Sequence, residues 1–272
     1  MRKADLAGAF VSFFLFSVYT MLENKSNGLT IKELTMEKDV IVALDFPSAN
    51  VAREFLARFD GEARKPFVKV GMELFYAAGP DFVLELKSKG YKIFLDLKLH
   101  DIPNTVAGAV RSLKGLGVDM LTLHASGGRE MFMRAREAVK DMNRPPILLA
   151  VTVLTSFSDA GRKEALLGEN RSAEDAVYHL AHLALQGGAD GVVSSAMEGK
   201  YLREHIRQSF PLVCPGIRPA GASVGDQKRV VTPADARDIG VDYIVVGRPI
   251  TQAKDPVAAY KAIKEEFLGG NQ

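Results

Sequence analysis

Cysteine is almost absent from this sequence, because Cys214 is the only one among its 272 residues. One cysteine excludes an internal disulfide and a zinc site made of thiolates alone, and it suits a reducing compartment. Excess charge is also small, with a formal net charge of +2, which excludes a strong general attraction to nucleic acid or an anionic membrane. We therefore predict a cytoplasmic protein that binds no nucleic acid and recognises any anion through a local site.

The first 35 residues differ in character from the rest of the chain. Two basic residues precede an apolar run over residues 6–22, which has the charged and apolar parts of a signal peptide or of a short membrane anchor. Bulky residues end this run, where a signal peptide would have small ones, and Met36 stands directly before the first predicted strand. We predict that residues 1–35 are an over-long start and that residues 36–272 form the barrel domain. An apolar anchor is the alternative, but no membrane partner is expected.

Short apolar runs alternate with amphipathic stretches from Asp39 onward. The predicted strands cover residues 40–44, 67–70, 92–97, 120–124, 147–154, 191–194, 211–214 and 243–246. The predicted helices cover residues 49–59, 82–89, 106–116, 130–142, 175–185, 198–208 and 257–267. Nearly continuous apolar strands are typical of a parallel sheet that helices cover. Glycines are expected to end four of the helices, at Gly90, Gly117, Gly188 and Gly240.

Eight strand–helix units in one domain predict the α/β class and a closed (β/α)8 TIM barrel. The rival is an open, doubly wound sheet, which usually has a glycine-rich turn after its first strand. The corresponding turn here is Asp45-Phe46-Pro47-Ser48, so the closed barrel is favoured. The active site of such a barrel forms at the carboxyl ends of its strands. Polar residues at those positions are therefore the candidates for function.

Four charged residues lie near the predicted carboxyl ends of the second and third strands. Asp96 and Lys98 are two residues apart, so on a strand both side chains project from the same face. Lys69 ends the neighbouring strand, and Asp101 lies just beyond the third strand. Charges inside a barrel are rarely left unpaired, so these four can neutralise one another. An ordinary surface ion-pair cluster is the alternative, but leucines flank both Asp96 and Lys98 and favour a functional site.

The segment 96–106, Asp-Leu-Lys-Leu-His-Asp-Ile-Pro-Asn-Thr-Val, resembles the signature of the orotidine 5′-phosphate decarboxylases. Further segments resemble the same family in order, at residues 42–45, 68–71, 151–156, 215–219, 225–233 and 245–250. The resemblance implies a carbon–carbon lyase with no cofactor and no metal, which removes CO2 from orotidine 5′-phosphate to form UMP. This reaction is the last step of de novo pyrimidine synthesis. The resemblance also implies a homodimer with shared active sites.

The resemblance assigns the catalytic work to Lys69, Asp96, Lys98 and Asp101. Loss of CO2 leaves an electron pair at C6 of the pyrimidine, which the site must stabilise electrostatically and protonate. Lys98 matches the proton donor, because an ammonium group is compact and carries three donors. Asp96 matches the carboxylate near the departing CO2, and with Asp101 it keeps Lys98 charged and aimed. Asp101 and Thr105 are expected to enter the neighbouring subunit's site.

The remaining matches concern substrate recognition. Asp45 and Lys69 resemble groups that contact the ribose, and Thr155 resembles the group at the pyrimidine edge. Four residues resemble a phosphate-binding set, Arg218, Gln227, Gly247 and Arg248. Barrels often hold phosphate in the loops after strands seven and eight, and a guanidinium can bind it bidentately. The stretch 219–227 has the length and glycines of a lid that Gln227 closes over the nucleotide; a plain surface loop is the alternative.

Two other functions compete with this interpretation. Ketogulonate-phosphate decarboxylases and hexulose-phosphate synthases share the Asp-x-Lys-x-x-Asp pattern but resemble magnesium enzymes, with a metal-binding glutamate where this chain has Lys69. Lysine at that position argues against a cation. A membrane-tethered barrel that only binds nucleotide is suggested by the apolar N-terminal run, and the complete set of four charged residues argues against it. His100 and His124 also lie near strand ends, where we expect structural roles.

Overall fold

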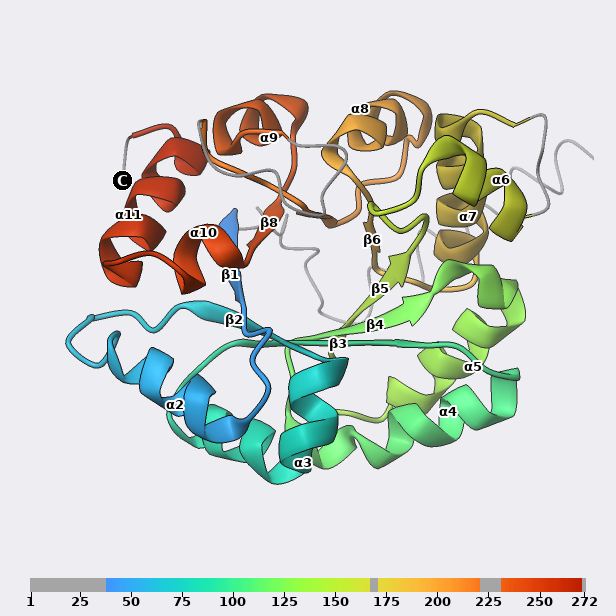
Figure 1. Cartoon of the computed structure of the whole chain (residues 1–272). Coiled ribbons are helices and arrows are strands. Elements are labelled where there is room, and N and C mark those ends of the chain that lie inside the picture. The colour runs from blue at the N-terminus through green and yellow to red at the C-terminus, as the bar shows by residue number, and fades with distance from the viewer. Residues whose placement is uncertain (1–37, 167–170, 221–230, 271–272) are drawn as a thin grey trace, which may run out of the picture. The chain divides into compact units, whose positions relative to one another are not determined.

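The computed structural model describes residues 38–166, 171–220 and 231–270. They form a closed barrel of parallel strands that pair in sequence order, β1 to β8, with helices around it (Figure 1). The strands are β1 Asp39–Ala43, β2 Phe67–Gly71, β3 Ile93–Leu99, β4 Met120–His124, β5 Ile147–Val151, β6 Gly191–Val193, β7 Leu212–Pro215 and β8 Tyr243–Val246. The predicted (β/α)8 fold is confirmed.

Helices connect each strand to the next, and two more follow the last strand. They are α2 Ala49–Ala57, α3 Met72–Ser88, α4 Pro103–Ser112, α5 Gly128–Val139, α6 Asp159–Leu166, α7 Ala173–Gln186, α8 Ala196–His205, α9 Pro233–Ile239, α10 Arg248–Thr251 and α11 Pro256–Leu268, with 3-10 turns η1 Lys114–Leu116 and η2 Ala125–Gly127. Ser172 and Ser195 cap α7 and α8 by accepting first-turn N–H groups. The four glycines predicted to end helices all have positive φ. Within these ranges, none of the helices has the length and apolarity needed to cross a membrane.

Apolar side chains pack on both faces of the barrel wall. The outer layer lies between strands and helices and includes Val42, Val70 and Leu95, each with 0 % exposure. The inner layer fills the barrel, with Ile41, Phe67, Phe94, Met120, Leu149, Val151, Val213 and Val245 among its buried members. This filling makes the barrel interior a packed core and not a pore.

The structure corrects several predicted boundaries. Helices α6, α9 and α10 were not predicted, because segments of 8, 7 and 4 residues are too short to establish a helical apolar period. Helix α3 begins at Met72 and not at residue 82, with a break at Gly79 (φ 72°) before Pro80; proline disfavours helical geometry in the residue before it. Strand β5 ends at Val151 and not at residue 154. The apolar run continues beyond it because it lines a cavity.

Candidate active site

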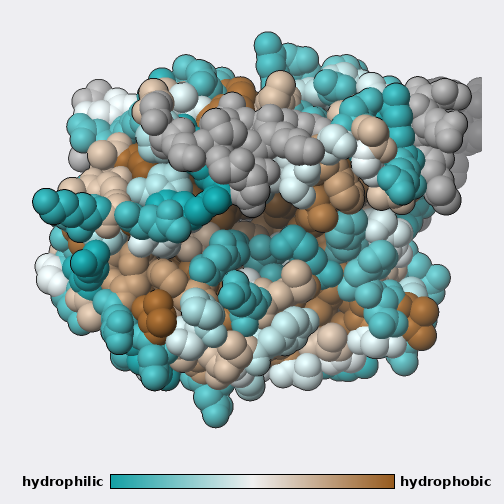
Figure 2. All heavy atoms as spheres, viewed as in Figure 1, coloured by the Kyte–Doolittle hydropathy of each residue, from teal (hydrophilic) through white to brown (hydrophobic). Residues whose placement is uncertain are grey.

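Two adjoining cavities lie at the carboxyl ends of the strands. The charged cavity, about 240 Å³ in volume, is lined by Lys69, Asp96 and Lys98 together with apolar and hydroxyl side chains. The arginine cavity, about 390 Å³ in volume, is lined by Arg218 and Arg248 among others. Lys69 and two apolar residues line both cavities, so one molecule can occupy the two together. The space-filling view shows a hollow near the centre of this face with hydrophilic side chains along it (Figure 2).

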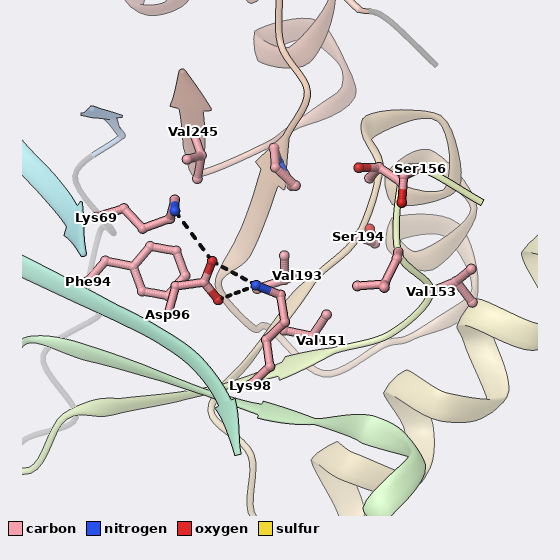
Figure 3. A pocket seen from close by; sticks show the side chains of 13 residues that line it. Lys69, Phe94, Asp96, Lys98, Val151, Val153, Ser156, Val193, Ser194 and Val245 are labelled. Carbon is pink, nitrogen blue, oxygen red and sulfur yellow. Dashed lines mark hydrogen bonds and ion pairs between the residues drawn. The ribbon is translucent and has the colours of Figure 1, made fainter. Parts of the chain in front are cut away.

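The carboxylate of Asp96 lies between Lys98 of the same strand and Lys69 of the neighbouring strand β2 (Figure 3). Lys98 Nζ donates to both carboxylate oxygens of Asp96, at 2.9 Å each. Lys69 Nζ is 3.7 Å from Asp96 Oδ2 and donates to Asp45 Oδ1 at 2.8 Å. The structure thus brings together three of the four charged residues that the sequence singled out, and adds Asp45 to them.

The two lysines determine the charge state of Asp96. Burial acts to raise the pKa of Asp96, but the positive charges of Lys69 and Lys98, together with side-chain hydrogen bonds, outweigh it and hold the pKa below its usual range. The side chains of Asp96 and Lys69 are only 13 % and 11 % exposed, so water screens these interactions weakly. Asp96 is therefore an anion at neutral pH, in direct contact with an ammonium group that faces the cavity.

Lys98 has an unusual backbone conformation. Its φ of 49° makes it the only non-glycine residue with positive φ among the described residues, and such strain is concentrated at functional sites. Lys98 N–H donates to Thr122 Oγ1 at 2.8 Å, and Thr122 Oγ1 donates to Asp96 Oδ1 at 2.9 Å. Thr122 was not among the residues that the sequence predicted for the site. The signal was available, because Thr122 is a polar residue two positions before His124 and therefore on the same face of an otherwise apolar strand.

Gly71 allows Lys69 and Asp45 to meet. A Cβ atom at position 71 would lie 3.0 Å from Lys69 Nζ and 3.4 Å from Asp45 Oδ1. Lys69 Nζ and Asp45 Oδ1 form the 2.8 Å hydrogen bond at the border of the two cavities. Any side chain at position 71 would therefore crowd this contact, which explains glycine at the end of β2.

The arginine cavity is built by the segments that follow β7 and β8. Arg218 is buried, at 5 % exposure, and its Nη1 donates to the carbonyl oxygen of Ile217 at 2.9 Å. Arg248 begins α10 directly after Gly247, and both line the cavity. Two guanidinium groups at this position in a barrel suit a phosphate group. Gln227, predicted to complete the phosphate-binding set, lies outside the described residues, as does most of the predicted lid.

The wall of the charged cavity away from the lysines is partly polar. Ser156 and Ser194 lie on that side (Figure 3), and Thr155, the residue expected at the pyrimidine edge, also lines the cavity. Apolar side chains complete the lining, namely Phe94, Val151, Val153, Leu154, Val193, Pro215 and Val245. An apolar pocket with a few hydroxyl groups suits a flat, partly polar ring.

Asp101 and Thr105 are the two described candidates that line neither cavity. Both are exposed; Asp101 lies just before α4, and Thr105 is in its first turn. Asp101 Oδ1 accepts the N–H of Ile102 at 2.7 Å, and no ion pair of Asp101 is found within the described ranges. The fourth predicted charge is therefore not part of the cluster within a single chain.

His100 and His124 stack on each other beside the site. Their ring centroids are 5.3 Å apart, with an angle of 22° between the rings, and His124 Nδ1 is 2.7 Å from Ser126 Oγ. Burial, followed by the nearby His100 and Lys98, lowers the pKa of His124. A neutral His124 held by a hydroxyl and by stacking agrees with the structural role expected for it.

The fold and the site together define a class of protein. The described part of the chain contains no group of three or more His, Cys, Asp or Glu side chains that could hold a metal ion. It does contain a partly buried lysine–aspartate–lysine cluster and, next to it, a cavity with two arginines at the ends of β7 and β8. This arrangement is typical of a (β/α)8 barrel enzyme that acts on a small phosphorylated substrate.

The model of the orotidine 5′-phosphate decarboxylase / HUMPS family matches residues 38–263, so the chain belongs to this family. An orotidine 5′-phosphate decarboxylase of Streptococcus pneumoniae is 55% identical over 227 residues, which are 84% of this chain and 95% of the relative. That of Streptococcus thermophilus is 53% identical over 231 residues, covering 85% and 98% of the two chains. The crystal structure of orotidine 5′-phosphate decarboxylase from Lactobacillus acidophilus has a TM-score of 0.72 and 45% identity, covering 85% of this chain and 99% of the other.

Proposed function

We propose that this chain decarboxylates orotidine 5′-phosphate to UMP, the last step of de novo pyrimidine synthesis. The observation that carries the proposal is the partly buried anion of Asp96 between Lys69 and Lys98, in a cavity that continues into the arginine cavity. The names of relatives more than 50% identical over most of the chain support the same reaction.

The chemical step takes place beside Lys98. The bond between C6 and the carboxylate carbon breaks, CO2 leaves, and the electron pair stays on C6. The ammonium group of Lys98 stabilises this charge in a weakly screened site and then donates a proton to C6; solvent returns the proton to Lys98. Asp96 holds Lys98 through two hydrogen bonds of 2.9 Å, which keep Lys98 charged and aimed.

The other side chains bind and orient the nucleotide. Lys69 and Asp45, joined at 2.8 Å where the cavities meet, contact the ribose. Thr155 contacts the pyrimidine edge. The phosphate-binding set in the arginine cavity consists of Arg218, Gly247 and Arg248, with Gln227 closing over the nucleotide. Binding energy at the phosphate thereby positions the ring at Lys98.

The active enzyme is a homodimer in this proposal. Asp101 and Thr105 are exposed and line neither cavity of their own chain. Residues that a chain donates to its partner's site are expected to be exposed in this way. A two-fold dimer would exchange these residues reciprocally. We place the enzyme in the cytoplasm, because its one cysteine, Cys214, is buried with its pKa raised by burial and is suited to packing, not to a disulfide.

A magnesium-dependent reaction through an enediolate is the second candidate, because the family also includes the HUMPS proteins. The two reactions differ in what they need at position 69, which is a metal-binding carboxylate for the second and an ammonium group for the first. Lys69 supports the first, since its Nζ already pairs with Asp45 and Asp96.

A turnover assay in the presence of a chelator tests the proposal. We expect the absorbance change of orotidine 5′-phosphate decarboxylation at an unchanged rate with EDTA. A rate that depends on added Mg²⁺ would support the second candidate, and no turnover of orotidine 5′-phosphate would refute the proposed function.

A further inference from the structure

Thr122 is a buried hydroxyl that the reaction steps above do not use. It is in the middle of β4, has 0 % exposure and is not part of the lining of either cavity. From this position its side chain cannot touch a bound nucleotide. Any effect of Thr122 on the reaction must therefore act through its neighbours.

Both hydrogen bonds of the Thr122 hydroxyl go to the charged cluster. The hydroxyl accepts the backbone N–H of Lys98 at 2.8 Å and donates to Asp96 Oδ1 at 2.9 Å. Asp96 in turn accepts from Lys98 Nζ at 2.9 Å. The backbone of Lys98, the hydroxyl, the carboxylate and the ammonium group thus form a closed ring, which fixes both ends of Lys98.

The irregular pairing of β3 with β4 explains why a side chain is needed here. Leu95 pairs with Leu121 and Leu99 pairs with Leu123, so β3 has three residues between these pairs where β4 has only Thr122. A bulge interrupts the ladder of backbone hydrogen bonds, and in this bulge Lys98 adopts its φ of 49°. The hydroxyl of Thr122 takes the position of the missing backbone acceptor, because the N–H of Lys98 is in a partly buried site where an unmade hydrogen bond is costly.

We propose that Thr122 is a positioning residue, whose hydroxyl holds the β3 bulge in the conformation that aims Lys98 and Asp96 at the reacting atoms. This inference rests on the proposed function. Without the hydroxyl, the strained conformation of Lys98 loses its support, and the ammonium group moves away from C6. Binding of the nucleotide, which uses other residues, is affected little.

The chain provides a matched control, Thr152. It is also fully buried, with 0 % exposure, and lies just after β5. Its Oγ1 donates to the carbonyl oxygen of Val193 at 3.0 Å, which also accepts the N–H of Thr152 at 3.1 Å. Loss of the Thr152 hydroxyl leaves that carbonyl with a partner and does not touch the charged cluster. Thr152→Val therefore changes a buried threonine without changing the position of the Lys98 ammonium group.

The experiment measures kcat and KM for orotidine 5′-phosphate, and the thermal midpoint, for Thr122→Val, Thr122→Ser and Thr152→Val in the full chain. We expect Thr122→Val to lower kcat by roughly 10- to 100-fold with KM changed by less than about threefold, because small errors in position cost about this much. Thr122→Ser, which keeps the hydroxyl, and Thr152→Val should retain kcat within about threefold of the unsubstituted enzyme.

The outcomes separate this inference from the function on which it rests. Equal kcat values for Thr122→Val and Thr152→Val would overturn the inference while the proposed function stands. If Thr122→Val does not fold, Thr122→Ser and Thr122→Ala form the second comparison, since both lack the methyl group and differ in the hydroxyl; equal kcat values there would also overturn it. No turnover by the unsubstituted enzyme would refute both.

Discussion

The charged cavity and the arginine cavity adjoin each other but are built in different ways. The charges of the first are on β2 and β3, in the barrel wall; hydrogen bonds join Lys98 to Asp96, and an ion pair joins Lys69 to Asp96. The arginines of the second follow β7 and β8, and Gln227, the other side chain expected to contact the phosphate, lies outside the described residues. In the proposed function, the groups that act on the reacting bond are thus fixed by strands, and the groups that bind the remote phosphate are placed on connecting segments. This division suits an enzyme that uses remote binding energy to assemble a rigid chemical site.

The largest effect should come from replacing the charged residues to which we assign the chemical step. Exchanging subunits between two such variants then tests whether the sites are shared. Lys98→Ala and Asp101→Ala should each lower activity by about 10³-fold or more, because each removes part of the proton-donating group or of its support. In the proposed homodimer, mixing the two variants makes about half of the dimers hybrid, each with one intact site of two, so roughly a quarter of the normal activity should return.

The exchange itself needs an independent check, for example by mass spectrometry of differently tagged subunits. If hybrids form and activity does not return, Asp101 acts within its own chain. The charged cavity would then be complete in one subunit, and the proposed sharing of sites would be wrong.

The next effect should distinguish the two cavities directly. Arg248→Ala should lower kcat/KM for orotidine 5′-phosphate by about 100-fold, which corresponds to roughly 3 kcal/mol, the value of a strong charge-assisted pair. The same variant should change turnover of the phosphate-free nucleoside far less, since that substrate has no phosphate for Arg248 to bind. Arg53→Ala is the control, because Arg53 pairs with Glu85 on α3 and lines neither cavity. Equal losses of kcat/KM on both substrates would refute the phosphate-binding role of Arg248.

A smaller effect should appear in the pH dependence of stability. The pKa of Asp96 is lowered in the folded chain, so its ionisation stabilises the fold above its unfolded pKa of about 3.9. This contribution is lost as the pH falls through the lower, folded pKa. The free energy of unfolding of the unsubstituted enzyme minus that of Asp96→Asn should therefore be constant near neutral pH and decrease toward pH 3. Urea unfolding of both proteins from neutral pH to pH 3 measures this difference in the free energy of unfolding. A difference that increases on acidification would contradict the lowered pKa of Asp96.

Sequence patterns predicted the barrel and most of the described site residues for a physical reason. Buried parallel strands give continuous apolar runs, and polar residues at their ends are conspicuous against that background, as Lys69 and Asp96 are. The bulge at Lys98 and the role of Thr122 were not predictable, because they depend on which residues of β3 and β4 face each other. Strand register across a bulge is a tertiary property that no local period encodes. Only the second half of helix α3 was predicted, because the break at Gly79 interrupts the apolar period.

The smallest effect should come from removing residues 1–35, which tests whether both cavities are complete without them. Strand β1 begins at Asp39, the family model matches from residue 38, and Ala43 is the first described residue that lines either cavity. A chain that begins at Met36 should therefore keep kcat and KM within about twofold and lose little stability. Assay of both chains at equal concentration, with the thermal midpoint as the second measurement, checks this.

Insolubility or lost activity of the shorter chain would mean that residues 1–35 belong to the folded enzyme. Equal activity together with membrane association of the longer chain alone would support the anchor in place of the over-long start.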